Sequence, residues 1–336
     1  MKYPWTPVLN IAIGLCLTIH PGQAAEQLDK ANAIHYRILS MEMPFNVEYS
    51  SRVKQYINSY VFSGKRETER MLGRSQMFFP MFEHYLKVYG LPDELKYIPL
   101  LESRLKPEAE SEAGAAGLWQ FIPETARQYR LTVNEYLDER KDPYKSTEAA
   151  MLMLSALYTE FQDWSLVLAA YNCGPGRVKR AIRLTGCDDS FWDIQHLLPQ
   201  QTQSYVPAMI ATIYVAKDYT WHELKPKAYS FYQKPYRVFK IYRSIDLEAI
   251  AHHCGMPSAE LNVLNPGYLQ SFIPASKKGH YLILPEDALP EFQQYVIKKS
   301  RAQTHRYAVA VLDSHSRPLP LQGLENYLLE QDKSKI

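Results

Sequence analysis

The sequence predicts a mainly α-helical protein, in which a large helical domain precedes a small domain with the order strand, helix, helix, strand. Between residues 75 and 220, apolar side chains recur at helical spacing and no alternating strand pattern interrupts them. After Trp221, lysine–proline pairs interrupt the chain and residues 236–242 alternate as a strand does. The 336 residues, 46% hydrophobic and 22% charged, suit a globular protein of two modest domains.

The first 24 residues predict a secretory signal peptide. Lys2 supplies a short basic region, residues 8–19 form an apolar run, and Gly22 and Ala24 are small residues at the −3 and −1 positions of a cleavage site. The apolar run is shorter than the stretch that a transmembrane helix requires. We therefore expect export to the periplasm or cell envelope, with an association with the outer membrane left open.

Composition gives no argument for nucleic-acid binding, because the formal net charge is only +2. No CxxC motif or His/Cys cluster suggests a metal, so we expect no metal and no cofactor. Of the four cysteines, Cys16 lies in the signal segment, where it would be lipidated only in a lipoprotein signal. Cys173 and Cys187 could form a disulfide or remain buried thiols, and Cys254 completes an odd set.

Residues 25–79 predict an N-terminal helical arm, with weak helical patterns at residues 31–39 and 47–60. A stronger helix is expected from Met77 to Tyr89, where Gly90 would stop it. Asp93 could cap the next helix. Pro99 should kink that helix close to Glu102.

Further helices are expected at residues 124–129, 147–161, 165–171, 177–184 and 204–219. In the second of these, the predicted inward face comprises Ala149, Leu152, Met153, Ala156 and Leu157. Residues 80–222 therefore form the predicted helical domain.

The small domain is expected at residues 236–288. Its strands lie at residues 236–242 and 281–284, and Asp246 and Pro257 open the two helices between them. Residues 289–336 are expected to be a C-terminal tail with one weak strand at residues 307–312.

Glu102 is the most informative polar residue, because it falls on the apolar face that Leu95 and Ile98 define. Desolvation on a buried face penalises the charged carboxylate and raises its pKa. A carboxyl group with a raised pKa can donate a proton near neutral pH. The alternative is a structural glutamate at a helix end, satisfied by Arg104 or by backbone donors.

The residues after Glu102 offer possible ligand contacts. Ser103 supplies a hydroxyl, and residues 111–117, ending at Gly117, form a loop of small residues that lets a ligand approach the backbone. Trp119 could be a stacking surface or a core residue, and Gln120 supplies an amide. The loop could equally be a tight corner.

Two later segments could contribute polar groups to the same cleft. Tyr171 and Asn172 lie at a helix end before Gly174, which also fits an ordinary glycine stop. Tyr205 lies near the start of the last helix.

Taken together, Glu102–Ser103, residues 117–120, residues 170–172 and residues 205–207 resemble the soluble-lytic-transglycosylase domain of family 1, which has a lysozyme-like fold. With the arm and the small domain, the chain resembles the membrane-bound D type of that family. Residues 236–285 resemble a LysM module, which binds glycans containing N-acetylglucosamine. The opening of this module, residues 242–246, departs from the usual glycine-aspartate-threonine-leucine pattern.

The resemblance implies a monomeric enzyme that cleaves the β-1,4 bond between N-acetylmuramic acid and N-acetylglucosamine in peptidoglycan glycan strands. It implies that Glu102 acts first as general acid and then as general base, which leaves a 1,6-anhydro ring on the muramic acid. The implied substrate-binding residues are Ser103, Gly117, Trp119, Gln120, Tyr171, Asn172 and Tyr205.

Two positions depart from the family pattern, because Gln201 stands where many relatives have glutamate and Trp119 where many have methionine. Two other functions remain open. One is a goose-type-lysozyme-like hydrolase, in which water attacks, and the other is a peptidoglycan-binding protein without catalysis.

Overall fold

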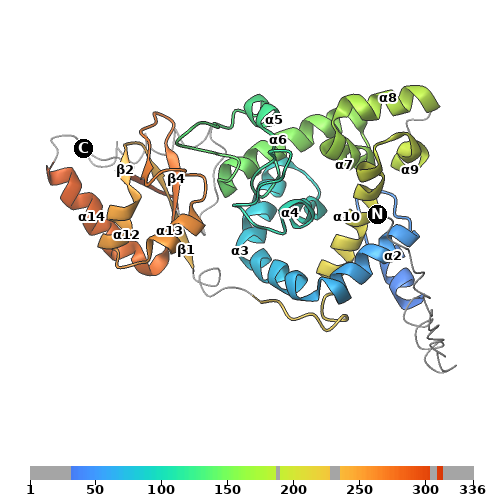
Figure 1. Cartoon of the computed structure of the whole chain (residues 1–336), viewed down its shortest axis with the longest axis horizontal. Helices are drawn as coiled ribbons and strands as arrows, with labels where there is room; N and C mark the ends of the chain where they lie inside the picture. The colour runs from blue at the N-terminus through green and yellow to red at the C-terminus, as the bar shows by residue number, and fades with distance from the viewer. Residues whose placement is uncertain (1–31, 187–189, 228–234, 303–308, 313–336) are drawn as a thin grey trace, which may run out of the picture. The chain divides into compact units, whose positions relative to one another are not determined.

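The computed structural model describes residues 32–186, 190–227, 235–302 and 309–312 (Figure 1). The chain divides into two compact units, residues 1–41 and 42–336. The first contains a helix at residues 32–39, which confirms the weak helical pattern there. The expected signal peptide, Cys16, Cys187 and residues 313–336 lie outside the described residues.

The second unit begins with three consecutive helical segments: α2 (Ser51–Asn58), the π-helical η1 (Ser59–Ser63) and α3 (Lys65–Tyr89). The Ser50 side chain accepts a hydrogen bond from a backbone N–H of the first turn and so caps α2. The expected boundary between arm and helical domain, at residues 79 and 80, falls inside α3.

The helix expected around Glu102 is two short helices. A 3₁₀ helix, η2 (Asp93–Tyr97), precedes α4 (Ile98–Ser103). Pro99 therefore lies in the first turn of α4, where its missing N–H breaks no helical hydrogen bond. The predicted kink is replaced by this break between the two helices.

The expected cap at Asp93 is wrong, because Pro92 holds the cap position of η2 and no side chain caps it. Asp93 instead accepts a hydrogen bond from Lys96 Nζ at 2.6 Å. Lys96 also donates to Glu83 at 2.6 Å, which ties η2 to α3.

Six further helical segments complete the helical domain, and the longer ones confirm the predicted series. They are α5 (Pro123–Gln128), α6 (Pro143–Phe161), α7 (Trp164–Cys173), α8 (Pro175–Thr185), α9 (Phe191–Ile194) and α10 (Gln200–Lys217), with the 3₁₀ turn η3 (Gln195–Leu197) before the last. The described residues between 75 and 220 contain isolated β-bridges but no strand.

The predicted inward face of α6 is partly wrong. Leu152 is 44% exposed and Ala156 is also exposed, whereas Ala150, Met151 and Leu154 are buried. The helix is apolar around most of its circumference, so periodicity does not select one face, and the contacts with α3 and α7 decide which side is covered.

α10 is the central helix of this domain, and Figure 1 shows it among its neighbours. It contacts α2, α7 and α4. Because it is surrounded, it is buried on nearly all sides, from Thr202 to Val215. Among the described residues, no helix has both the length and the apolar character that a membrane crossing requires.

The small domain has a three-stranded antiparallel sheet in the order β4 (His280–Pro285), β1 (Tyr236–Ile241), β5 (Val309–Leu312). In the register, Val238 lies opposite Ile283 on one side and Leu312 on the other. A second pair of short strands, β2 (Ile245–Asp246) and β3 (Phe272–Ile273), flanks the helices α12 (Leu247–His253) and α13 (Ser258–Leu264). The predicted strand, helix, helix, strand order and the cap at Asp246 are confirmed.

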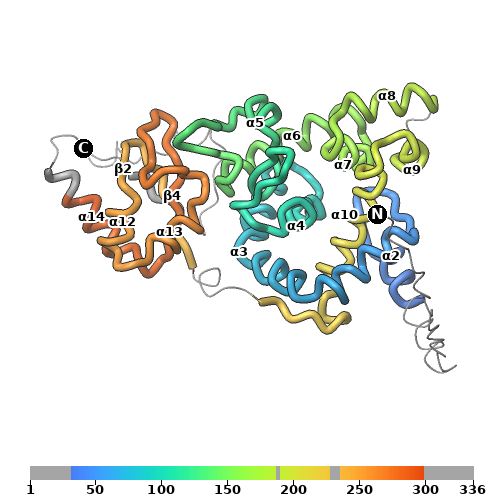
Figure 2. Tube along the Cα trace, viewed as in Figure 1, coloured from blue at the N-terminus to red at the C-terminus, as the bar shows by residue number. Residues whose placement is uncertain are grey.

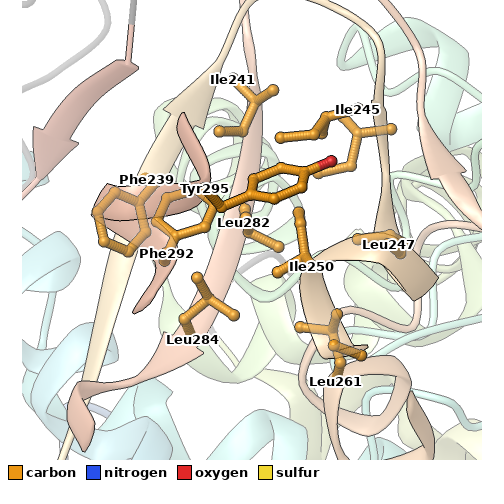
Figure 3. Close-up of a cluster of buried hydrophobic side chains, with 12 residues drawn as sticks. Phe239, Ile241, Ile245, Leu247, Ile250, Leu261, Leu282, Leu284, Phe292 and Tyr295 are labelled. Atoms are coloured by element: carbon orange, nitrogen blue, oxygen red, sulfur yellow. The ribbon is translucent and has the colours of Figure 1, made fainter. Parts of the chain in front are cut away.

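The tail expected at residues 289–336 is wrong for its first part, because a 3₁₀ turn, η4 (Glu286–Ala288), leads into the helix α14 (Leu289–Ala302). Phe292 and Tyr295 of α14 are buried, and they complete the core of the small domain (Figure 3). The Phe292 ring lies 4.8 Å from the ring of Phe239 on β1. The helix therefore belongs to the domain.

Candidate active site

Glu102 lies near the end of α4, on the side where Leu95 and Ile98 are fully buried. Its side chain is itself half-buried. Tyr205 of α10 donates a hydrogen bond from its hydroxyl to Glu102 Oε1 at 2.5 Å. The structure thus brings together two predicted site residues from helices that are distant in the sequence.

Burial raises the pKa of Glu102 from 4.5 to about 7, and the hydrogen bond from Tyr205 lowers it in part. The side chain keeps some exposure to solvent, yet the surrounding protein removes most of the water that would stabilise its charge. Near neutral pH the group can therefore either give or take a proton.

Ser103 is buried and its hydroxyl is used inside the protein. It donates to the carbonyls of Pro99 at 3.0 Å and Leu118 at 2.9 Å. The expected contact between Ser103 and a sugar is not favoured by this arrangement. The residue instead ties α4 to the loop that follows it.

That loop, residues 109–121, is here named the site loop, and Figure 2 traces it between α4 and α5. Gly117 has φ +83°, and a Cβ at this position would lie 1.7 Å from the carbonyl oxygen of Arg140. Only glycine fits this close approach. The Gln120 amide nitrogen donates to the carbonyls of Gly117 at 2.9 Å and Ala109 at 3.3 Å, so Gln120 also stabilises the loop.

Trp119 is a core residue and not a stacking surface, because its side chain is fully buried. Its indole N–H donates to Thr147 Oγ1 at 2.9 Å, and its ring packs edge-on against Phe82 at 5.3 Å. The backbone carbonyl of Trp119 accepts a hydrogen bond from the Tyr171 hydroxyl at 2.6 Å. Tyr171 therefore supports the site loop from α7.

Asn172 is held by a residue that sequence analysis did not select. The hydroxyl of Thr202 on α10 donates to Asn172 Oδ1 at 2.8 Å, and Thr202 is buried. Thr202 adjoins Gln201, the position that departs from the family pattern. A pattern of polar residues on a buried helix face would have pointed to it.

Burial and the charge of Glu102 raise the pKa values of both Tyr205 and Tyr171. Burial, and then the nearby Glu102 carboxylate, raise the pKa of Tyr205 well above its ordinary value. The same two causes raise the pKa of Tyr171 well above its ordinary value. Both hydroxyls therefore remain hydrogen-bond donors at physiological pH, and both lie close enough to respond to the charge on Glu102.

The carboxylates in and just before the site loop lie at the protein surface. Glu108, Glu110 and Glu112 are exposed, and Glu110 pairs with Lys141 at 2.6 Å. Among the described residues, no group of three or more His, Cys, Asp or Glu side chains could hold a metal ion.

Comparison with known proteins finds matches for two parts of the chain. A family model described as the transglycosylase SLT domain matches residues 80–191. A second, described as the LysM-like domain of lytic transglycosylase MltD, matches residues 237–299. The two matches follow one another in the order of the helical and the small domain, and these two parts are called the SLT domain and the LysM-like domain after the models they match. The SLT match contains Glu102 and the site loop, whereas Tyr205 lies beyond it. The LysM-like match includes most of α14.

Related proteins match parts of the chain. Membrane-bound lytic murein transglycosylase D of Escherichia coli (strain K12) is 30% identical over 249 residues, which cover 73% of this chain and 54% of the relative. The chain thus spans about half the length of that relative. A putative tributyltin chloride resistance protein of Alteromonas sp. (strain M-1) is 41% identical over 94 residues, 28% of this chain and 45% of that protein. The crystal structure of the 70 kDa soluble lytic transglycosylase of Escherichia coli is 17% identical, with a TM-score of 0.38 over 60% of this chain and 45% of that chain.

Proposed function

We propose that this protein is a peptidoglycan lytic transglycosylase that cleaves the β-1,4 bond between N-acetylmuramic acid and N-acetylglucosamine. The observation that carries the proposal is the half-buried carboxyl of Glu102, with a pKa of about 7 and a hydrogen bond from Tyr205. The SLT domain around it and the LysM-like domain after it support peptidoglycan as the substrate.

In the proposed reaction, protonated Glu102 gives its proton to the glycosidic oxygen. The C1–O bond breaks, and the N-acetylglucosamine side leaves with a new hydroxyl. The N-acetyl group of the muramic acid stabilises the positive charge at C1. Glu102, now a carboxylate, takes the proton of the C6 hydroxyl, and O6 bonds to C1 to form the 1,6-anhydro ring. The proton returns to Glu102 and no water is consumed.

A single carboxyl near neutral pKa suits this cycle, because the same group must be an acid in one step and a base in the next. Desolvation and Tyr205 are the two causes of the pKa shift of Glu102, and no second carboxylate contributes to it among the described residues. Glycosidases that use two carboxyl groups need both at a defined separation. The proposed cycle has no such need.

Mass analysis of the products tests the proposal. Purified protein is incubated with peptidoglycan, and the fragments are expected to be lighter by one water than those with a normal reducing end. Glu102→Gln should abolish the products, whereas Glu108→Gln, which changes an exposed glutamate just before the site loop, should not.

Two other outcomes would replace the proposal. Fragments with only a normal reducing end would indicate a goose-type-lysozyme-like hydrolase. Binding without cleavage, with Glu102→Gln indistinguishable from the natural chain, would indicate a peptidoglycan-binding protein.

We also infer that the protein works in the cell envelope, since the N-terminal 24 residues have the composition of a secretory signal. Cell fractionation checks this inference, and recovery from the cytoplasm with residues 1–24 still attached would contradict it. Glycan binding by the LysM-like domain is part of the proposal, and a pull-down of the full chain on insoluble peptidoglycan tests it.

A further inference from the structure

A buried arginine, Arg140, lies behind the site loop and holds two of its carbonyls. Its Nη1 donates to the carbonyl of Gly114 at 2.6 Å and to that of Phe121 at 3.2 Å. Between these points, the carbonyl of Arg140 itself packs against Gly117. Arg140 therefore contacts the site loop at three points: Gly114, Gly117 and Phe121, the last residue of the loop.

The guanidinium of Arg140 is fixed by Asp138. Arg140 Nε donates to Asp138 Oδ1 at 2.8 Å and Nη2 donates to Oδ2 at 2.7 Å, and both side chains are buried. A two-point contact of this kind sets the plane of the guanidinium, which a lysine could not reproduce. The remaining Nη1 donor is thereby aimed at the site loop.

The segment that contains this pair is in turn held by the LysM-like domain. The Asp138 N–H donates to the carbonyl of Gly267 at 2.8 Å, and the Leu269 N–H donates to the carbonyl of Tyr136 at 3.0 Å. These bonds form a short antiparallel contact between the two domains. A Cβ at Gly267 would lie only 3.1 Å from the Asp138 carbonyl oxygen, so the two backbones meet closely.

Side chains extend the same contact beyond the backbone bonds. The rings of Tyr144 and Tyr281 lie 5.5 Å apart, and Lys145 Nζ lies 5.4 Å from the centre of the Tyr281 ring. His280 Nδ1 lies 3.7 Å from Glu139 Oε1. The residues on both sides of Arg140 are thus engaged with the LysM-like domain.

We propose that Arg140 is a positioning residue for the site loop, and that the LysM-like domain supports catalysis by holding the segment that carries Arg140. The domain then serves the SLT site as scaffold, whatever glycan it binds. The catalytic part of this inference rests on the proposed function; the mechanical part does not.

Four variants of the full chain test it. Arg140→Met removes the donors to the site loop, and Arg140→Lys keeps the charge without the two-point geometry. Gly267→Val pushes on Asp138 from the LysM-like domain. Arg237→Met is the matched control, because it breaks a 2.6 Å ion pair with Glu286 inside the LysM-like domain.

The first readout is hydrogen–deuterium exchange of the site-loop amides, which needs no activity. Arg140→Met and Gly267→Val should each speed exchange in residues 109–121 about tenfold or more, Arg140→Lys should do so less, and the control should not. The second readout is kcat and KM on peptidoglycan. Here kcat should fall about 10- to 100-fold with a smaller change in KM, because misplacement of the loop disturbs the reacting geometry.

Unchanged site-loop exchange in Arg140→Met would overturn the proposal. Changed exchange in Arg140→Met with none in Gly267→Val would overturn the part assigned to the LysM-like domain. If Arg140→Met does not fold, Arg140→Lys and Gly267→Val decide the matter by the same two readouts. A natural chain that yields no anhydro product would defeat the proposed function, and the exchange data would still decide the positioning role.

Discussion

The hydroxyl of Tyr205 donates a hydrogen bond to Oε1 of Glu102 across 2.5 Å, although 103 residues separate them in the chain. A donor aimed at a carboxylate favours its charged form, so Tyr205 opposes the desolvation that raises the pKa of Glu102. The balance of the two effects sets that pKa at about 7.

Tyr205→Phe should therefore raise the pKa of Glu102 further. In a profile of kcat/KM against pH, the fall in activity on the alkaline side should shift to higher pH, because the group remains protonated longer. The rate at the optimum should drop about tenfold, because the carboxylate loses its partner in the second step. Tyr129→Phe, in α5's C-terminal turn, serves as control. An alkaline limb at its original pH would contradict the assigned role.

Glu102→Gln should stabilise the fold at alkaline pH. The folded-state pKa of about 7 exceeds the ordinary 4.5, so the folded protein holds this proton more tightly than the unfolded chain. The stability that the protonated form contributes is complete below pH 4.5 and is lost as the pH rises through about 7. Above pH ~8, the variant should exceed the natural chain by up to about 3 kcal/mol.

Chemical denaturation at two pH values measures this difference in the free energy of unfolding. At about pH 4 the two proteins should be nearly equal. Asp142, whose pKa burial raises to about 6, is present in both and cancels in the comparison. A variant less stable than the natural chain at alkaline pH would show that Glu102 is not desolvated in the folded state.

Trp119→Phe should weaken the fold and leave substrate affinity nearly unchanged. The variant loses the hydrogen bond to Thr147 and part of a fully buried ring, which should cost about 1–3 kcal/mol. Denaturation curves and initial rates measured side by side separate the two effects. A large rise in KM with unchanged stability would restore the stacking role that the sequence left open.

Phe292→Ala should destabilise the LysM-like domain by about 3–5 kcal/mol, because Phe292 is buried in its core. Ile297→Ala is the matched control on the same helix, because Ile297 is 51% exposed and should change stability by less than about 0.5 kcal/mol. Thermal unfolding followed by circular dichroism measures both. Equal effects of the two changes would mean that α14 does not pack as described.

Local sequence patterns were enough to predict the helical domain, the order of elements in the small domain and the residues that the experiments above test. Apolar residues at helical spacing located α6, α7, α8 and α10, and start or stop signals such as Asp142 before α6 helped to bound them. Glu102 could be selected from the sequence because a glutamate is rarely placed on an apolar helix face, where burial of its charge costs free energy. These are local properties, which neighbours in the sequence decide.

Tertiary structure alone decided which site residues meet and what each does. The sequence around Trp119 and Ser103 is compatible with side chains that face either a ligand or the core. The packing of the site loop against α3, α4 and α6 places both side chains in the core. The sequence predicted a tail where α14 lies, because the burial of this helix depends on contacts with β1, some fifty residues earlier in the chain. The meeting of Tyr205 with Glu102, and of Arg140 with the site loop, likewise comes from contacts between segments that no local pattern connects.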